Sequence, residues 1–95
     1  MAASFSYDSL NQLIKHHPNE AYLYYHRAKI LSDQKRIEDA MYDIDRAIML
    51  DSVKAAFYLL KADLYYIQQK TRLAKESLEK CLSVDKNNID AYLKL

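Results

Sequence analysis

The stretch AYLYYHRAKIL, residues 21–31, returns 34 residues later as AAFYLLKADLY, residues 55–65, with Tyr58 in the place of Tyr24 and Ala62 in the place of Ala28. One further step of the same length brings Tyr24 and Tyr58 into line with Tyr92. The shift also aligns residues of one size or chemical type, which are Ala28 with Ala62, Leu31 with Tyr65, Ala40 with Ala74, Ile44 with Leu78, Ala47 with Cys81, Ile48 with Leu82 and Asp51 with Asp85. A fixed repeat of this kind predicts stacked copies of one small unit.

The composition predicts that each unit is helical. The 95 residues include no Gly and one Pro, which leaves few sites for tight turns with positive φ, and no stretch alternates strictly between apolar and polar residues. Apolar residues recur at spacings of three and four, as in Leu10, Leu13 and Ile14, which places each set on one helical stripe. Polar breaks then divide the chain into predicted helices at 5–17, 20–33, 37–50, 54–68, 72–84 and 88–95. The predicted N-caps are Thr71 and either Asn87 or Asn88.

The aligned residues resemble the tetratricopeptide repeat family, whose unit of about 34 residues is a helix-turn-helix. The family's aromatic, small, aromatic pattern in the first helix is matched by Tyr24, Ala28 and Leu31, and then by Tyr58, Ala62 and Tyr65. Its second-helix alanine followed by a large apolar residue is matched by Ala40 with Ile44 and by Ala74 with Leu78.

The chain departs from the family pattern at two kinds of position. The proline that closes each unit is present only as Pro18, with Ser52 and Lys86 in its later places. The frequent leucine before the small residue of the first helix is replaced by Arg27 and then by Lys61.

The resemblance implies an all-α fold, a right-handed α-solenoid of antiparallel helix pairs. Residues 1–20 are then the second-helix half of a preceding repeat or an N-terminal cap helix, 21–54 and 55–88 are repeat units, and 89–95 are the truncated start of a third repeat. We expect the small residues to let paired helices approach closely. The aromatics Tyr24, Tyr58 and Tyr92 are expected to fill the wedge between neighbouring units.

One side of each unit's first helix lines a concave groove that accepts peptides in this family, so the resemblance implies a peptide-binding site. Its candidate residues are Tyr22, Tyr25, His26, Lys29, Leu59, Leu60, Asp63, Tyr66 and Ile67. Exposed apolar patches with a polar rim mark interaction sites, and tyrosine suits them because its ring buries area while its hydroxyl stays polar. We expect Lys29 and Asp63 to set the register of the bound segment. The alternative is that flanking helices or a second copy cover these side chains.

The same positions argue against one ligand class of the family. Members that bind chaperone tails clamp a terminal carboxylate with asparagines and lysines. Here Lys29 and Asp63 stand in the asparagine places and Tyr25 stands in a lysine place. We therefore expect no two-carboxylate clamp.

No pattern in the sequence predicts catalysis. His16 and His17 are adjacent and so do not share a helical face, and His26 has no carboxylate at helical spacing. Cys81 stands in an alanine slot, which predicts a buried small residue. A chain without Gly has no glycine-rich phosphate loop. We predict no catalytic residue, no metal site and no cofactor.

The charge balance and the hydropathy of the chain limit the kinds of partner that we expect. The 14 Lys and Arg nearly balance the 13 Asp and Glu, with no long block of either sign, so we expect no nucleic-acid partner. No apolar run approaches the roughly 20 residues that span a bilayer, so we expect no direct membrane insertion, and the start MAASFSYDSL lacks the order of a signal peptide. The single cysteine fits a reducing compartment, which favours the cytoplasm, while an exported or envelope-anchored parent protein stays open.

We therefore predict a non-enzymatic protein–protein interaction scaffold that binds a partner peptide or helix in a concave groove. The alternative is a structural or oligomerisation module within a longer protein. Leu10 and Ile14 at one end, and Tyr92 and Leu93 at the other, belong to half-units without partners. They predict a homo-oligomer formed through these half-units.

Overall fold

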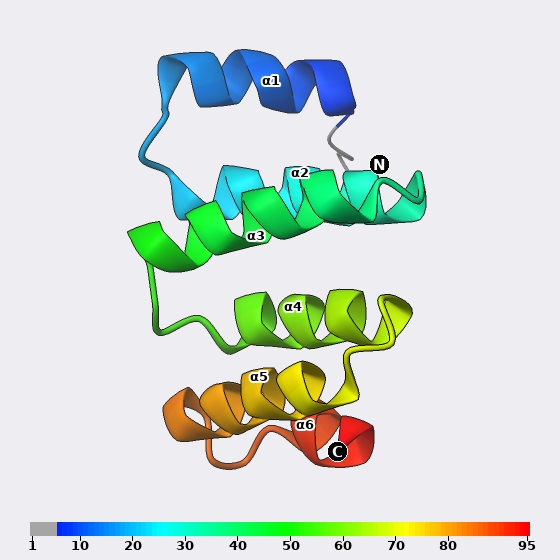
Figure 1. Ribbon diagram of the computed structural model, residues 1–95. Coiled ribbons are helices and arrows are strands. Elements are labelled where there is room, and N and C mark those ends of the chain that lie inside the picture. The colour runs from blue at the N-terminus through cyan, green and yellow to red at the C-terminus, as the bar shows by residue number, and fades with distance from the viewer. Residues whose placement is uncertain (1–5) are drawn as a thin grey trace, which may run out of the picture.

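The computed structural model describes residues 6–95, and this part of the chain folds into six α-helices (Figure 1). In chain order they are α1 (Tyr7–His16), α2 (Ala21–Asp33), α3 (Ile37–Leu50), α4 (Ala55–Ile67), α5 (Thr71–Val84) and α6 (Ile89–Lys94). Each lies within two residues of a predicted helix, although residue 5, where the first was expected to begin, lies outside the described residues. None of the helices in residues 6–95 combines the length and apolarity needed to cross a membrane.

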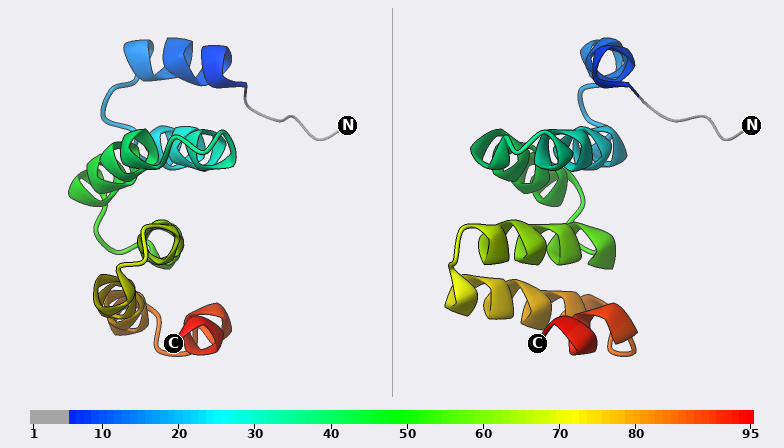
Figure 2. Two further views of the ribbon diagram at one scale, coloured as in Figure 1. Left: turned by 45° about the vertical axis from the view of Figure 1, so that its right-hand side comes forward. Right: turned by 90° about the vertical axis from the view of Figure 1, so that its right-hand side faces the viewer.

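The helices form antiparallel pairs that stack along one direction. The closest packing is within the pairs α2–α3 and α4–α5, while α3 packs on α4, α1 on α2 and α5 on α6. Helices α2, α4 and α6 lie on one side of the stack and α3 and α5 on the other (Figure 2). The predicted all-α solenoid of helix pairs is confirmed.

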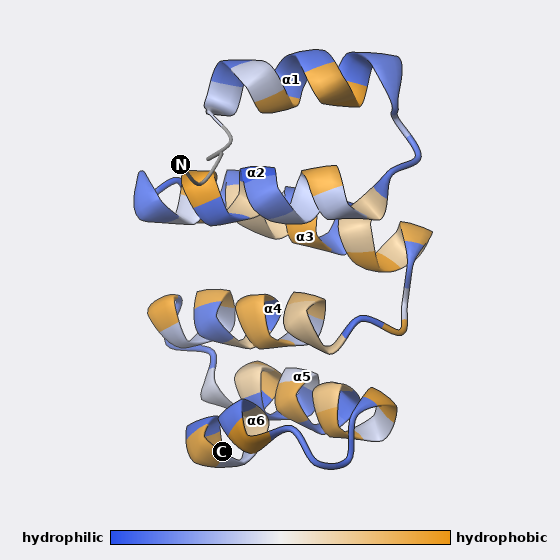
Figure 3. Ribbon diagram, turned by 180° about the vertical axis from the view of Figure 1, so that it is seen from behind, coloured by the Kyte–Doolittle hydropathy of each residue, from blue (hydrophilic) through white to orange (hydrophobic). Residues whose placement is uncertain are grey.

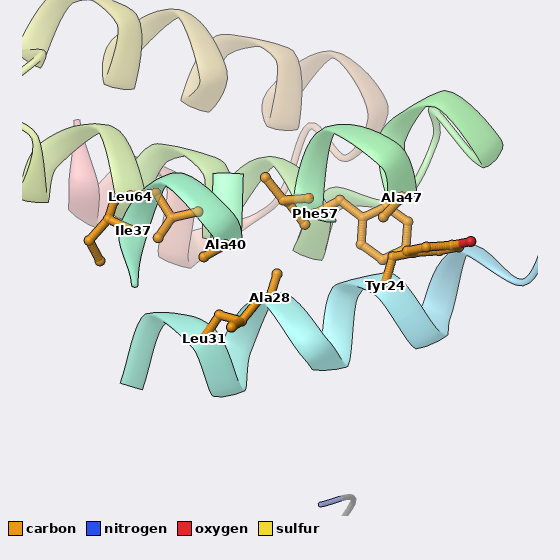
Figure 4. Close-up of a cluster of buried hydrophobic side chains, with 9 residues drawn as sticks. Tyr24, Ala28, Leu31, Ile37, Ala40, Ala47, Phe57 and Leu64 are labelled. Carbon is orange, nitrogen blue, oxygen red and sulfur yellow. The ribbon is translucent and has the colours of Figure 1, made fainter. Parts of the chain in front are cut away.

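The core alternates large and small side chains, as the repeat predicts. One buried cluster joins three helices (Figure 4) and consists of Tyr24, Ala28, Leu31, Ile37, Ala40, Ile44, Ala47, Phe57 and Leu64. The second consists of Tyr58, Ala62, Ala74, Leu78, Cys81 and Ala91. Because Phe57 and Leu64 of α4 complete the first cluster, each helix pair buries its face against the next pair.

The tyrosines that repeat every 34 residues share one hydrogen bond. The hydroxyl groups of Tyr24 and Tyr58 donate to the carbonyl oxygens of Pro18 and Ser52, at 2.7 Å and 2.6 Å. The hydroxyl of Tyr92 donates to the carbonyl of Lys86, at 3.0 Å. The acceptor always lies six residues earlier, at the position of the family's proline, so the bond forms whether or not that residue is proline.

The three tyrosines differ in how far their side chains are buried. Tyr24 and Tyr58 are only 6% and 9% exposed, which agrees with the predicted filling of a wedge. Tyr92 is 57% exposed, so the expectation that it fills the same wedge is wrong. The reason is that within residues 6–95 no second helix follows α6 to cover its ring.

Two turns use positive φ without glycine, contrary to the expectation from composition. Lys35 has φ of 65° and Gln69 has φ of 60°. After α2, the Lys35 amide donates to the carbonyl of Ser32 and the Arg36 amide donates to that of Leu31, both at 2.9 Å. This pair of bonds is the Schellman motif, which satisfies the last carbonyls of a helix. The turn after α4 repeats it around Gln69.

Replacing Lys35 or Gln69 with glycine is expected to stabilise the fold by about 0.5–1 kcal/mol. The left-handed conformation costs an L-residue roughly 1–2 kcal/mol, and glycine's greater freedom in the unfolded chain offsets part of that gain. Urea unfolding followed by circular dichroism measures the change. As a control, Lys75→Gly in the exposed interior of α5 should lose about 1 kcal/mol. A loss at Lys35 comparable to that at Lys75 would contradict the argument.

One predicted N-cap is right and the other is wrong. The side chain of Asn88 accepts a hydrogen bond of 2.9 Å from the amide of Ala91 and caps α6. Thr71 is instead the first residue of α5, and Lys70 is its N-cap without a side-chain bond. The Lys70 amide donates to the carbonyl of Tyr65 in the turn after α4, which fixes Lys70 at the boundary.

Candidate functional site

Two adjoining hollows lie on the side of the stack formed by α2, α4 and α6. The larger, which we name the seam hollow, has a volume of about 510 Å³. It lies between the first turns of α2 and α4, beside the connection from α3 to α4. Its lining residues are Asn19, Glu20, Ala21, Tyr22, Tyr25, Leu50, Asp51, Lys54, Ala55, Ala56 and Phe57. The lining combines aromatic and aliphatic walls with a few charged groups from the helix ends.

The smaller hollow, which we name the groove hollow, has a volume of about 240 Å³ and lies between α2, α4 and α6. Its lining residues are Tyr25, Lys29, Ala56, Leu59, Leu60, Asp63, Asp90 and Lys94. Tyr25 and Ala56 line both hollows, so the two adjoin along the α2–α4 face.

The groove hollow brings together five of the predicted site residues, namely Tyr25, Lys29, Leu59, Leu60 and Asp63. Tyr22 lines the seam hollow and is 56% exposed. The other three, His26, Tyr66 and Ile67, line neither hollow. Leu60 packs against the first core cluster and Leu59 against the second, so both are shared between core and surface.

Tyr25 is held in place by its neighbours. Its ring centre lies 5.2 Å from that of Phe57 on α4 and 5.3 Å from that of His26. The ammonium group of Lys29 lies 5.4 Å from the centre of the Tyr25 ring, in a cation–π contact. A side chain fixed on three sides loses little conformational entropy when a ligand covers it.

His26 is a half-buried ring between two tyrosines. Its ring meets that of Tyr22 edge-on at 4.1 Å between centres. Burial lowers the pKa of His26 below its ordinary value, and the nearby charge of Lys29 lowers it further. Both effects favour the neutral imidazole.

Asp63 and Tyr66 connect α4 to α6. The ammonium group of Lys94 lies 2.9 Å from a carboxylate oxygen of Asp63, and the Tyr66 hydroxyl donates to the carbonyl of Lys94 at 2.7 Å. The charge of Asp63 is therefore already balanced by Lys94. Of these two residues, Lys29 can therefore present its charge to a ligand, whereas the charge of Asp63 is already paired.

Sequence reasoning missed a buried ion pair between α2 and α3. The guanidinium of Arg27 donates to both carboxylate oxygens of Asp43, at 2.7 Å and 2.8 Å, and to the side-chain oxygen of Asn11 at 3.0 Å. Asp43 is 2% exposed, and its hydrogen bond to Arg27 is the main reason that the pKa of Arg27 is raised. The sequence did contain a signal for this pair, because Arg27 stands where the family often has leucine. A buried cation at such a place needs a carboxylate nearby.

The next unit repeats half of this arrangement. Lys61, in the place of Arg27, lies 2.8 Å from a carboxylate oxygen of Asp45, and Asp45 is in the place of Asn11. Ser77 replaces Asp43 in this unit and is also buried. Each cation therefore reaches back to the second helix of the preceding pair, and only Arg27 also binds a carboxylate in its own pair.

In residues 6–95 no group of three or more His, Cys, Asp and Glu side chains could hold a metal ion. Cys81 is fully buried, as its alanine slot predicts, and burial is the main reason that the pKa of its thiol is raised. A thiol in that state is a poor nucleophile.

Helix pairs repeated every 34 residues, with hollows on the side of the first helices, define an α-solenoid repeat protein. A family model described as Tetratricopeptide repeat matches residues 21–53 and 55–88. The chain belongs to the tetratricopeptide repeat family.

One curated relative and several solved structures are similar to the chain. The chain is 32% identical over 84 residues to Tetratricopeptide repeat protein 13 of Homo sapiens. The aligned region covers 88% of this chain and 10% of that protein. The first TPR of Spaghetti (RPAP3) bound to the HSP90 peptide SRMEEVD has a TM-score of 0.88 at 24% identity, covering 94% of this chain and 72% of that one. The TPR2B domain of yeast Sti1, in a pHsp70 complex, has a TM-score of 0.84 at 24% identity, covering 93% and 73%. These two structures share the fold.

Proposed function

We propose that the chain is a non-enzymatic protein-interaction scaffold that binds an apolar segment of a partner protein along the α2–α4–α6 face. Domains of this family are typically interaction modules, and the matches indicate no catalytic family. Spaghetti (RPAP3) and Sti1, which share the fold, were solved with an HSP90 peptide and in a pHsp70 complex. The observation that carries the proposal is the pair of adjoining hollows that meet at Tyr25 and Ala56.

The seam hollow suits a large apolar side chain of the partner. Small residues, Ala21, Ala55 and Ala56, leave the space open between the rings of Tyr22, Tyr25 and Phe57. Interface energy concentrates in a few anchors that fill such pockets. Because Tyr25 packs on Phe57 before any ligand binds, the wall of the pocket is already formed.

The groove hollow suits the part of the segment that follows the anchor. Leu59 and Leu60 form an apolar floor, and Lys29, Asp90 and the Asp63–Lys94 pair provide charges of both signs at its edge. A mixed rim of this kind fits an apolar segment with alternating charges better than one ending in several carboxylates, because paired acids and bases present little net positive charge. The proposed partner therefore differs from the acidic HSP90 peptide bound to Spaghetti.

Replacing Ala56 with glutamate is expected to weaken binding at least tenfold, which corresponds to about 1.4 kcal/mol. Ala56 is exposed and lines both hollows, so the larger, charged side chain occupies the apolar site without entering the core. Peptides enriched from a random phage-displayed library against the parent chain provide the probe. Their labelled synthetic forms are titrated by fluorescence polarisation with both chains.

Two further variants make the test specific. Met49→Glu, at a 78% exposed position on α3, introduces the same side chain outside both hollows and should bind like the parent. Tyr22→Ser removes the exposed wall of the seam hollow and should weaken binding. If the selected peptides bind the Ala56 and Tyr22 variants as well as the parent, the α2–α4–α6 face is not the binding site.

A further inference from the structure

The groove hollow is lined by four charged side chains, and two of them are already paired. The ammonium group of Lys94 lies 2.9 Å from a carboxylate oxygen of Asp63, so these two charges neutralise each other. The other two, Lys29 on α2 and Asp90 on α6, are exposed, and neither forms an ion pair within residues 6–95. A ligand in this hollow therefore meets one available positive charge and one available negative charge.

The fold places these two charges on different helices and at different heights. Helix α4 lies between α2 and α6 along the stack, so Lys29 and Asp90 lie on opposite sides of α4 (Figure 1). The 34-residue repeat puts Lys29 at the level of Asp63 and Asp90 at the level of Ala56. These two levels are seven residues apart on α4, which corresponds to about 10 Å along a helix. The two available charges therefore lie on a diagonal across α4.

The surface between the two charges is apolar. Leu59 and Leu60 of α4 line the hollow and are half-buried, and α4 is mostly hydrophobic along its length (Figure 3). Ala56, on the same helix, is exposed and continues this surface into the seam hollow. A charged group of a ligand placed over the two leucines would lose water without gaining a partner. A fitting ligand therefore presents an apolar group between its charges.

We propose that the segment bound at this face carries an acidic side chain and a basic side chain on either side of an apolar residue. The acid binds Lys29, the base binds Asp90, and the apolar residue covers Leu59 and Leu60. This inference rests on the proposed function, because it specifies the chemistry of the segment that the α2–α4–α6 face binds.

The two available charges determine both the composition and the direction of the segment. A wholly acidic segment brings like charges together at Asp90, and a wholly basic segment does so at Lys29, which opposes binding. Because the charges lie at the two ends of a diagonal, only one direction across α4 pairs both of them. Asp90, rather than Asp63, is then the negative charge that sets the register together with Lys29, since Asp63 is paired with Lys94.

Reversing each charge of the chain tests the proposal with the peptides enriched from the phage-displayed library. The peptides that bind the parent should share an acid and a base separated by an apolar residue. Lys29→Glu and Asp90→Lys should each weaken their binding about tenfold in fluorescence polarisation, because an attraction becomes a repulsion. Lys75→Glu and Glu79→Lys, at exposed positions of α5 outside both hollows, are the matched controls and should bind like the parent.

Complementary changes in the peptide assign each contact. Replacing the acid of the peptide with lysine should restore binding to the Lys29→Glu variant and not to the Asp90→Lys variant. Replacing the base with glutamate should restore binding to the Asp90→Lys variant alone. Because a change in the peptide does not repair a misfolded chain, such a rescue reports the direct coupling of two charges.

A neutral variant gives a second measurement that preserves the size of both side chains. In the chain with Lys29→Gln and Asp90→Asn, the affinity should depend less on salt concentration than in the parent, since salt screens exposed charges. An equal salt dependence in the two chains would contradict the proposal.

The outcomes separate this inference from the proposed function. If Ala56→Glu weakens binding but both charge reversals leave it unchanged, the α2–α4–α6 face is the binding site and the charge pairing is overturned. If the reversals weaken binding and neither complementary peptide restores it, the pairing is overturned as well. If neither Ala56→Glu nor the reversals change the affinity, the proposed function and the inference both fail.

Discussion

Replacing Arg27 with alanine is expected to lower the free energy of unfolding by about 3–5 kcal/mol, the range measured when one partner of a buried ion pair is removed. The Asp43 carboxylate is 2% exposed and accepts two hydrogen bonds from the Arg27 guanidinium. Without the cation, this carboxylate stays buried and loses both donors. Urea unfolding followed by circular dichroism measures the loss.

Two comparisons isolate the cause of that loss. The double change Arg27→Leu with Asp43→Ser removes both charges, and Ser77 already occupies the place of Asp43 in the next unit, so it should recover most of the stability. Lys61→Ala should cost only about 0–1 kcal/mol, because the Lys61–Asp45 pair is more open to solvent than the Arg27–Asp43 pair. A loss below about 1 kcal/mol for Arg27→Ala would show that water compensates the buried carboxylate.

Replacing Tyr58 with alanine is expected to cost about 3–5 kcal/mol, as for other large aromatic residues truncated in a core. The Tyr58 ring is 9% exposed and packs in the second cluster between α4 and α5. Its loss opens a cavity beside Ala62 and Ala74, which are too small to fill it. A typical domain is stabilised by only about 5–15 kcal/mol, so this loss is a large share of the total. The midpoints of thermal and urea unfolding should therefore both fall strongly.

The matched control is Tyr92→Ala. The residue type and the backward hydrogen bond are the same, but the ring is largely exposed, so the change should stay within about 0.5 kcal/mol. Tyr58→Phe removes only the hydroxyl that donates to Ser52 and should cost about 1 kcal/mol. If Tyr58→Ala and Tyr92→Ala lower the free energy of unfolding equally, burial of the tyrosine ring by the second helix contributes little to stability.

The fold could be predicted from the sequence because the residues that build its core recur at regular spacings. Several core residues of the two complete units that lie 34 positions apart share size and burial, as Ala28 and Ala62 do, and the spacing of three and four within each helix determines the buried side. The helix ends were less predictable. Lys35 and Gln69 adopt positive φ although nothing in their chemistry favours it, since the packing of the flanking helices determines the turn.

The candidate site could be predicted only where it follows the helix periodicity. Five of the nine predicted residues line the groove hollow because they share one side of α2 and α4. The seam hollow was not predictable, since helix ends and a connection form it and no regular spacing relates Asn19, Leu50 and Lys54. The Arg27–Asp43 and Asp63–Lys94 pairs join residues 16 and 31 positions apart, and one sequence does not show which charges meet across helices.

The hydrogen bond from each repeated tyrosine to a main-chain carbonyl has a consequence for how the sequence can vary. Every residue provides a carbonyl, so the bond that closes each turn places no demand on the side chain six positions earlier. Proline, serine and lysine occupy that position at residues 18, 52 and 86 of this chain. These sites can therefore accumulate substitutions that alter charge or solubility while the pitch of the stack stays constant, which gives repeats of one protein room to diverge.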